Sequence, residues 1–363
     1  AHESRIKIES GPLRKFENMI IILFCLIRWD IIKLWDSLLI FIRILYLLVI
    51  INTLLSILIH FRDFYNLFSF RHKGFSKKFV KHFSSENNSL NPWYVTGFVD
   101  AEGCFNINIT KSSSNLVGYQ VQARFIIEVN IKDISMLHSI QAFFGGIGSI
   151  TSTSKVARYS VHGINDINNI TSFFDEYPLQ SAKQIDFALW KECVKLMLSK
   201  NHLITQGLEK ILSYKTAMNY GESDKLKLLF PNINSIKRPL VEISNSKLNP
   251  FWVSGFIGGE GSFYVNTKKN TLRVRPVFSI GLNQKDKPLL IRINKFFKEI
   301  GSIYESDTNN SAELKIFKSS GFCDLMDHFS SYPLKGFKLY NFTIWCEIVK
   351  LLENKEMTPE ILD

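Results

Sequence analysis

Hydrophobic and polar positions alternate along residues 93–162 in a pattern that predicts both helices and strands. An apolar segment with helical spacing covers 93–102, and a strand follows in which Phe105, Ile107 and Ile109 face one side. The other side of this strand and of the next one is predicted to carry Asn106, Asn108, Thr110, Gln120, Gln122, Arg124 and Asn130. A helix at about 132–144, two short strands near 148–162 and two further helices complete the unit.

The same unit occurs twice. The segment LNPWYVTGFVDAEGCF at 90–105 returns as LNPFWVSGFIGGEGSF at 248–263, and the similarity continues until 90–200 is duplicated as 248–354. Repetition on this scale indicates one structural unit used twice. We therefore predict an α+β fold of two pseudo-symmetric αββαββα units, each with an antiparallel, saddle-like sheet.

Composition divides the chain into four parts. Residues 1–85 form an apolar leader, 86–200 and 248–363 hold the repeats, and 201–247, rich in Asn, Ser and Lys, is the expected linker. Within the leader, Leu38–Ile59 is long enough to cross a bilayer, although Arg43 interrupts it. Two interpretations stay open: a membrane segment, with the basic run after it keeping the repeats on the side of synthesis, or a leader that is removed.

The net charge of +11 favours a polyanionic partner such as nucleic acid, or an anionic membrane surface. The five cysteines are scattered without metal-like spacing, which indicates a reducing compartment and no structural zinc. The abundance of Phe, Ile, Asn and Lys fits translation of an AT-rich gene, as in many organelle genomes.

The repeated helices, at 95–103 and 253–261, each carry small residues four positions apart. These pairs are Gly97 with Ala101 and Gly255 with Gly259. Such stripes let two helices pack backbone to backbone, so we expect the motif helices at the interface between the repeats.

A carboxylate follows each stripe, Glu102 in one helix and Glu260 in the other, and a glycine that suits a helix end comes next. Helix packing would bring the two carboxylates side by side. Like charges this close need a cation between them, and hard oxygen ligands suit Mg²⁺ or Mn²⁺. Phosphodiester hydrolysis by metal-activated water uses this arrangement, whereas a single glutamate at a helix end is usually only solvated.

Both motif segments, each preceded by LNP and an aromatic pair, resemble the two motifs of the LAGLIDADG homing endonuclease family, over about residues 90–354. The resemblance implies that Glu102 and Glu260 bind the catalytic divalent metal ions. It also implies a basic residue near each scissile phosphate, and the matching positions after the two YPL segments are Lys183 and Lys338. A lysine there stabilises charge on the phosphate or assists the attacking water.

Two further positions follow from the resemblance. Asn130 and Asn283 match a polar position beside the metal ions and would hold a water molecule. The second motif departs from the family pattern at Gly258, where the first has Asp100, but this is not the metal position.

The polar face of each sheet is the predicted DNA-reading surface, because amide and guanidinium side chains on a curved sheet can read base edges in the major groove. The residues expected to contact DNA are Asn106, Asn108, Gln120, Gln122, Arg124, Tyr264, Asn266, Lys268, Arg273 and Arg275. Matching positions carry different residues, so a long, asymmetric double-stranded target is expected.

The resemblance thus implies a monomeric, single-chain, metal-dependent DNA endonuclease that promotes intron homing and is the product of a mitochondrial or chloroplast intron. The composition that fits an AT-rich gene favours the mitochondrial matrix over a chloroplast. The alternative is an RNA-binding maturase that assists splicing of its host intron and needs no metal carboxylates. A third interpretation, a membrane-associated interaction protein, accounts for Leu38–Ile59 but for neither glutamate.

Overall fold

The computed structural model describes Met19 and residues 89–353, except 220, 222, 241–245 and 268–273. Both repeats belong to one compact unit, Asn87–Asp363. Segment 38–59, Lys268 and Arg273 lie outside the described residues, so the expectations for them stay predictions. In the described part of the chain, no helix combines the length and the apolar character that a bilayer span requires.

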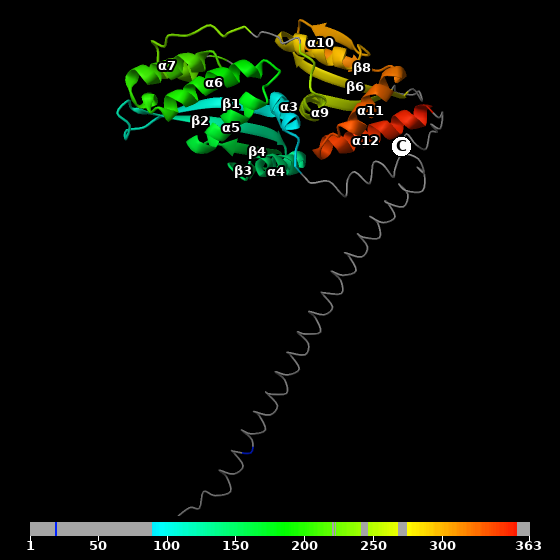
Figure 1. Cartoon of the computed structure of the whole chain (residues 1–363), viewed down its shortest axis with the longest axis horizontal. Coiled ribbons are helices and arrows are strands. Elements are labelled where there is room, and N and C mark those ends of the chain that lie inside the picture. The colour runs from blue at the N-terminus through cyan, green and yellow to red at the C-terminus, as the bar shows by residue number, and fades with distance from the viewer. Residues whose placement is uncertain are drawn as a thin grey trace, which may run out of the picture. The chain divides into compact units, whose positions relative to one another are not determined.

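The first repeat has the predicted order of elements, with two helices at its C-terminal end (Figure 1). Its helices are α3 (Pro92–Glu102), α4 (Ile134–Phe143), α5 (Ile164–Glu176) and α6 (Lys183–Leu198). Its strands are β1 (Gly103–Lys111), β2 (Tyr119–Asn130), β3 (Ser149–Ser152) and β4 (Val156–Val161). They form an antiparallel sheet in the order β1-β2-β4-β3, and a short 3-10 turn, η1 (Ile131–Asp133), joins β2 to α4.

The second repeat reproduces this order. Its helices are α9 (Pro250–Glu260), α10 (Lys287–Phe296), α11 (Phe322–Ser331) and α12 (Gly336–Glu353). Its strands are β5 (Gly261–Thr267), β6 (Val274–Asn283), β7 (Ser302–Ser306) and β8 (Ser311–Ile316). The sheet order β5-β6-β8-β7 matches that of the first sheet, and η3 (Gln284–Asp286) takes the place of η1. The prediction of a duplicated α+β fold is confirmed.

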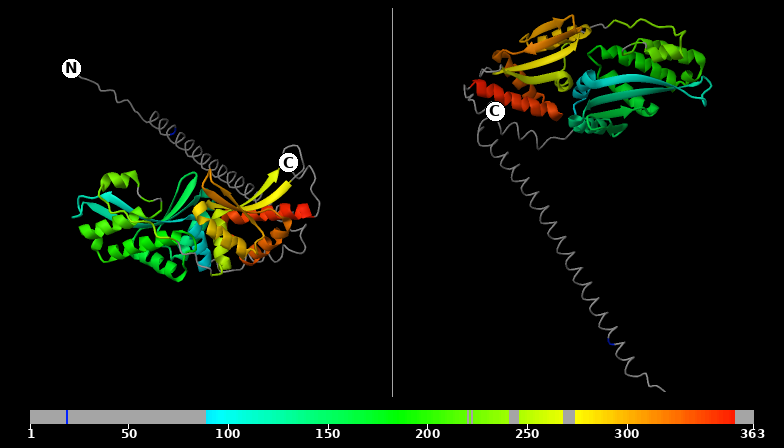
Figure 2. Two further views of the ribbon diagram at one scale, coloured as in Figure 1. Left: turned by 90° about the horizontal axis from the view of Figure 1, so that it is seen from above. Right: turned by 180° about the vertical axis from the view of Figure 1, so that it is seen from behind.

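Each sheet is covered by helices on one face only, and the two sheets lie on either side of the central helices α3 and α9 (Figure 2). The covered face of β1 carries Phe105, Ile107 and Ile109, all buried, as the alternation predicted. Each repeat has its own hydrophobic core, with Trp190 at 0% exposure in the first and Trp345 at 2% in the second. Because both cores lie on the helical side, the opposite sheet faces are left for polar side chains.

The repeated LNP segments begin the motif helices. Asn91 and Asn249 cap α3 and α9, because each side chain accepts a hydrogen bond from the backbone N–H two residues later, at 2.9 Å in both cases. A proline follows at the first helical position, where no N–H is needed. The sequence repeat therefore fixes the same starting point for both helices.

Helices α3 and α9 pack backbone to backbone, as their small residues predicted. A Cβ added at Gly97 would lie 2.0 Å from the carbonyl oxygen of Trp252, and one at Gly255 would lie 2.1 Å from that of Tyr94. At Gly259 an added Cβ would lie 2.4 Å from the Cβ of Ala101. Only glycine permits this approach, so these positions determine how closely the two repeats join.

The expected linker, 201–247, contains two helices, α7 (Thr205–Thr216) and α8 (Asp224–Leu229). Leu208, Ile211 and Leu212 of α7 are buried and join the core of the first repeat. Further on, the guanidinium of Arg238 donates to both carboxylate oxygens of Asp186 on α6, at 2.5 and 3.0 Å. Part of this segment is therefore built into the first repeat.

Candidate active site at the ends of the paired helices

Two carboxylates meet where α3 and α9 end. The Glu102 carboxylate lies against the second motif, since a Cβ added at Gly259 would be 3.0 Å from its Oε1. Burial raises the pKa of Glu102. Burial, and then the charge of Glu102, raise the pKa of Glu260 to about 7. The predicted juxtaposition of the two glutamates is present, and their mutual repulsion is one of the forces at the site.

The glycines after the glutamates do end the helices, but a close approach of the backbone requires them, and not a left-handed helix cap. Gly103 and Gly261 end the helices in extended conformations, with φ of −78° and −69°, and not in the left-handed region. A Cβ at these positions would lie 2.7 Å from the Val99 carbonyl oxygen and 2.6 Å from that of Ile257. The absent side chains let each strand start directly beneath its helix, which keeps the glutamates at the junction.

Two lysines reach the same helix ends. The Nζ of Lys183 donates to the carbonyl oxygens of Ala101, at 2.6 Å, and Val99, at 3.3 Å. The Nζ of Lys338 donates to Gly259 O at 3.3 Å and to Gly261 O. Each lysine belongs to the same repeat as the helix end that it contacts.

The charges of the lysines and glutamates are coupled. Burial lowers the pKa of both Lys183 and Lys338, while the neighbouring carboxylates raise it. In return, the two ammonium groups lower the pKa of Glu102 and Glu260 against the larger effect of burial. The four side chains predicted to act together therefore form one electrostatic cluster.

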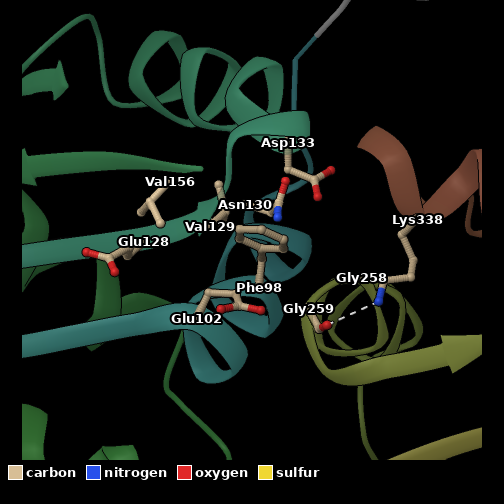
Figure 3. A pocket seen from close by; sticks show the side chains of 10 residues that line it. All are labelled: Phe98, Glu102, Glu128, Val129, Asn130, Asp133, Val156, Gly258, Gly259 and Lys338. Atoms are coloured by element: carbon tan, nitrogen blue, oxygen red, sulfur yellow. Dashed lines mark hydrogen bonds between the residues drawn. The ribbon is translucent and has the colours of Figure 1, made fainter. Parts of the chain in front are cut away.

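A cavity of about 320 Å³ opens beside Glu102 (Figure 3). Asn130, Asp133 and Lys338 line it, and Figure 3 shows the Lys338 side chain extending to the end of α9. The side-chain oxygens of Asn130 and Asn283 accept hydrogen bonds from the backbone N–H groups of Lys132 and Lys285 and cap the turns η1 and η3. Of these two asparagines, only Asn130 lines this cavity, and their water-holding role stays a prediction.

Asp133 and Asp286 were missed by the sequence reasoning. Asp133 Oδ1 accepts a hydrogen bond from the backbone N–H of Phe337 at 2.8 Å, immediately before Lys338. Asp286 accepts one from the backbone N–H of Ala182, immediately before Lys183. Each repeat thus holds the start of the other repeat's lysine helix. The available signal was the aspartate that closes the matched stretches 120–133 and 273–286.

Motif hydroxyls also connect to the YPL segments. Thr96 Oγ1 on α3 donates to the Tyr177 carbonyl at 3.1 Å, and Ser254 Oγ on α9 donates to the Tyr332 carbonyl at 2.7 Å. We call the segments 177–183 and 332–338 the lysine loops, because each ends at its lysine. These bonds place the start of each lysine loop relative to the motif helix of its own repeat. They explain why a hydroxyl residue occupies the second position of both motifs.

The polar sheet faces carry the predicted DNA-contact residues. Asn106 pairs with Arg124 and Asn108 with Gln122 across β1 and β2, and Arg124 Nε donates to Gln122 Oε1 at 2.7 Å. In the second repeat Asn266 pairs with Arg275. The other described members, Gln120 and Tyr264, lie on the same faces by strand parity. The structure brings these side chains onto one face per sheet, while contact with DNA stays a prediction.

The comparisons with known proteins concern this duplicated region. A family model described as LAGLIDADG endonuclease matches residues 95–194 and 253–349, more than half of the chain. A Neurospora crassa protein named probable intron-encoded endonuclease 3 is 35% identical over 286 residues, or 76% of this chain. The match covers 54% of that protein, so the chain spans about half of its length.

Solved structures agree in fold and sequence. The LAGLIDADG homing endonuclease I-GzeII in complex with its DNA target is 35% identical, with a TM-score of 0.70, over 75% of this chain and 94% of that one. I-SmaMI bound to an uncleaved DNA target in the presence of calcium ions is 33% identical, with a TM-score of 0.71, over 76% and 96% of the two chains. With both motifs, the duplicated fold and the paired glutamates in place, this chain belongs to the LAGLIDADG endonuclease family.

Proposed function

We propose that this chain is a site-specific endonuclease that hydrolyses both strands of a long, asymmetric double-stranded DNA target and promotes intron homing. The observation that carries the proposal is the convergence of two glutamates and two lysines at the ends of α3 and α9. Phosphodiester hydrolysis needs negative charge neutralised and a water molecule activated at one point. Duplication of the set provides one lysine for each strand.

The donor set suits a divalent cation. Burial and the charge of Glu102 raise the pKa of Glu260 to about 7 even though two lysines are close. The lysines therefore do not fully offset the cost of two charged carboxylates at this place. No group of three or more His, Cys, Asp or Glu side chains in the described residues is arranged to hold a metal. Two carboxylates would therefore share the ion with water and phosphate oxygens, which is how Mg²⁺ commonly binds. Glu102 and Glu260 would hold Mg²⁺ or Mn²⁺, which when bound activates water and neutralises phosphate charge.

The lysines would act from their present positions. The ammonium groups of Lys183 and Lys338 donate to the carbonyl oxygens of Ala101 and Gly259, the residues that immediately precede the two glutamates. A phosphate brought to the carboxylates would compete for these N–H donors, and charge-assisted bonds to phosphate are stronger than bonds to neutral carbonyls. The lysines would then stabilise the charge that develops on the phosphate or orient the attacking water.

The polar sheet faces would select the target. Their asparagine, glutamine and arginine side chains offer the donors and acceptors that distinguish base pairs in the major groove. Different residues at matching positions support an asymmetric site, since Asn106 faces Arg124 in the first sheet whereas Tyr264 faces Val277 at the equivalent place in the second. The duplicated fold in one chain supports action as a monomer. The intron-encoded name of the Neurospora crassa relative, with an amino-acid composition that fits an AT-rich organelle gene, supports a location in an organelle, which we propose is the mitochondrion.

The test is cleavage selection with the full chain. A randomised duplex library is incubated with Mg²⁺, and cut ends are sequenced for the wild type, the Glu102→Gln, Glu260→Gln double variant, and Glu209→Gln, which replaces an exposed glutamate of α7. Specific cuts by the wild type and Glu209→Gln, and none by the double variant, support the proposal. Retained binding to DNA or to intron RNA without any cutting by the wild type would instead indicate the maturase.

A further inference from the structure

The two lysine loops are equivalent in sequence position but are held by different chemistry. In the first repeat, the Asp100 carboxylate accepts hydrogen bonds from the backbone N–H groups of Gln180, at 2.8 Å, and Ser181, at 3.1 Å. It also accepts from the Ser181 hydroxyl and, at 2.7 Å, from Trp252 Nε1 of the other motif helix. A buried carboxylate with four donors thus fixes the chain two residues before Lys183.

The second repeat has no such carboxylate, because Gly258 stands at the position of Asp100. Tyr94, which matches Trp252 in the motif repeat, takes over: its Oη accepts the backbone N–H of Lys335 at 3.0 Å. A Cβ added at Gly258 would lie 3.0 Å from this oxygen, so the phenol occupies the space that a motif aspartate would use. The same aromatic position supports the carboxylate in one half and replaces it in the other.

The Lys338 loop is consequently held by the opposite repeat. Tyr94 lies on α3 and Asp133 follows β2, and together they accept the backbone N–H groups of Lys335 and Phe337. Tyr94 is 2% exposed, and burial raises the pKa of its hydroxyl far above the usual range, so it stays neutral. A neutral oxygen accepts a weaker hydrogen bond than a carboxylate does. Both loops have an aspartate contact from the opposite repeat, Asp133 or Asp286, but beyond it the Lys338 loop has one neutral oxygen where the Lys183 loop has a carboxyl group with four donors.

We propose that Tyr94 is a positioning residue for cleavage of one DNA strand, the strand whose phosphate Lys338 serves. This inference rests on the proposed endonuclease function. Loss of the phenolic oxygen releases the Lys335 N–H and lets Lys338 drift from the metal-binding glutamates, while Lys183 keeps its own support. The enzyme then cuts one strand at its normal rate and the other slowly, so nicked DNA accumulates.

The experiment measures each strand separately. The full chain, in excess and with Mg²⁺, cuts its selected target, a duplex with a different fluorophore on each strand. Lys338→Met and Lys183→Met assign each strand to its lysine. Tyr94→Phe, which removes one oxygen, is expected to slow the Lys338 strand about five- to tenfold, the effect of one lost hydrogen bond, with the other strand and the affinity for DNA nearly unchanged.

Trp252→Phe is the matched control, because it removes the indole N–H from Asp100 and is expected to slow the opposite strand. The double variant Tyr94→Trp, Gly258→Asp rebuilds the arrangement of the first half and should restore the slowed strand. If Tyr94→Phe does not fold, Asp133→Ala removes the contact with Phe337 and must produce the same strand bias. Equal slowing of both strands, or no slowing of either, overturns the proposal, whereas a wild type that cuts neither strand refutes the endonuclease function itself.

Discussion

Replacing Glu260 with glutamine should stabilise the metal-free protein at alkaline pH while abolishing cleavage. The pKa of Glu260 is raised from 4.5 to about 7, first by burial and then by Glu102. Between these values the folded protein retains a proton that the unfolded chain has lost. The contribution of this group to stability is therefore complete below pH 4.5 and is lost as the pH rises through 7.

The magnitude follows from the difference between the two pKa values. At about 1.4 kcal/mol for each tenfold change in acid dissociation, the charged carboxylate costs up to about 3 kcal/mol at pH 8. Because the side chain is partly exposed, solvent screening reduces this cost, and we expect about 1–2 kcal/mol. For a protein of this size, that energy corresponds to an increase in Tm of about 2–6 °C. Neutral glutamine has nearly the same shape and avoids the cost.

The assay is thermal unfolding in EDTA, at pH 5 and pH 8, of the wild type, Glu260→Gln and the exposed-site control Glu209→Gln. We expect Glu260→Gln to raise Tm at pH 8, to change it little at pH 5, and to differ from the control only at the higher pH. Adding Mg²⁺ should then raise Tm of the wild type more than that of the variant, because ligand binding stabilises the state that binds it. A variant that is less stable than the wild type at pH 8 would refute the cost that burial and the neighbouring Glu102 impose on the charged Glu260.

Three further predictions follow from the same geometry. Gly97→Ala should destabilise the protein by about 3 kcal/mol or more, measured by urea unfolding, because its Cβ would collide with the Trp252 carbonyl at 2.0 Å; unchanged stability would contradict the close helix packing. Lys338→Met should lower the single-turnover cleavage rate of one strand by about 10²–10³ with unchanged DNA affinity, measured with saturating protein; weaker binding at an unchanged rate would make the lysine a binding residue only. Arg124→Ala should cost about 1–3 kcal/mol of discrimination at one base-pair position, measured by cleavage of all single-base target variants; a uniform loss across positions would place Arg124 on the phosphate backbone.

Much of the site follows from local sequence that is repeated. The glutamates, the small-residue stripes and the asparagine caps all lie within the motif segments 90–105 and 248–263, where spacing along a helix fixes which side chains share a face. The opposite orientations of Phe105 and Asn106 also follow from local sequence, because successive side chains of a strand point to opposite faces. The second copy supplied the decisive information, because a single glutamate at a helix end has no special meaning.

The helical content of 201–247 was obscured by its polar composition. Leu208, Ile211 and Leu212 do have helical spacing, but the helix is short and its apolar face is defined only by the core on which it packs. The anchoring of this segment by Arg238 to Asp186 joins residues that are 52 positions apart, a contact that no local pattern predicts.

The sequence by itself determined the duplication, the paired glutamates and lysines, and the face of each sheet, because all of these depend on periodicity and on comparison of one copy with the other. Only the tertiary structure decided which repeat supports which lysine. Asp133 contacts Phe337 and Tyr94 contacts Lys335, across 204 and 241 positions of the chain. The physical reason is the close approach of α3 and α9, which brings side chains of one repeat within hydrogen-bond distance of the other and allows a phenol to replace a missing carboxylate.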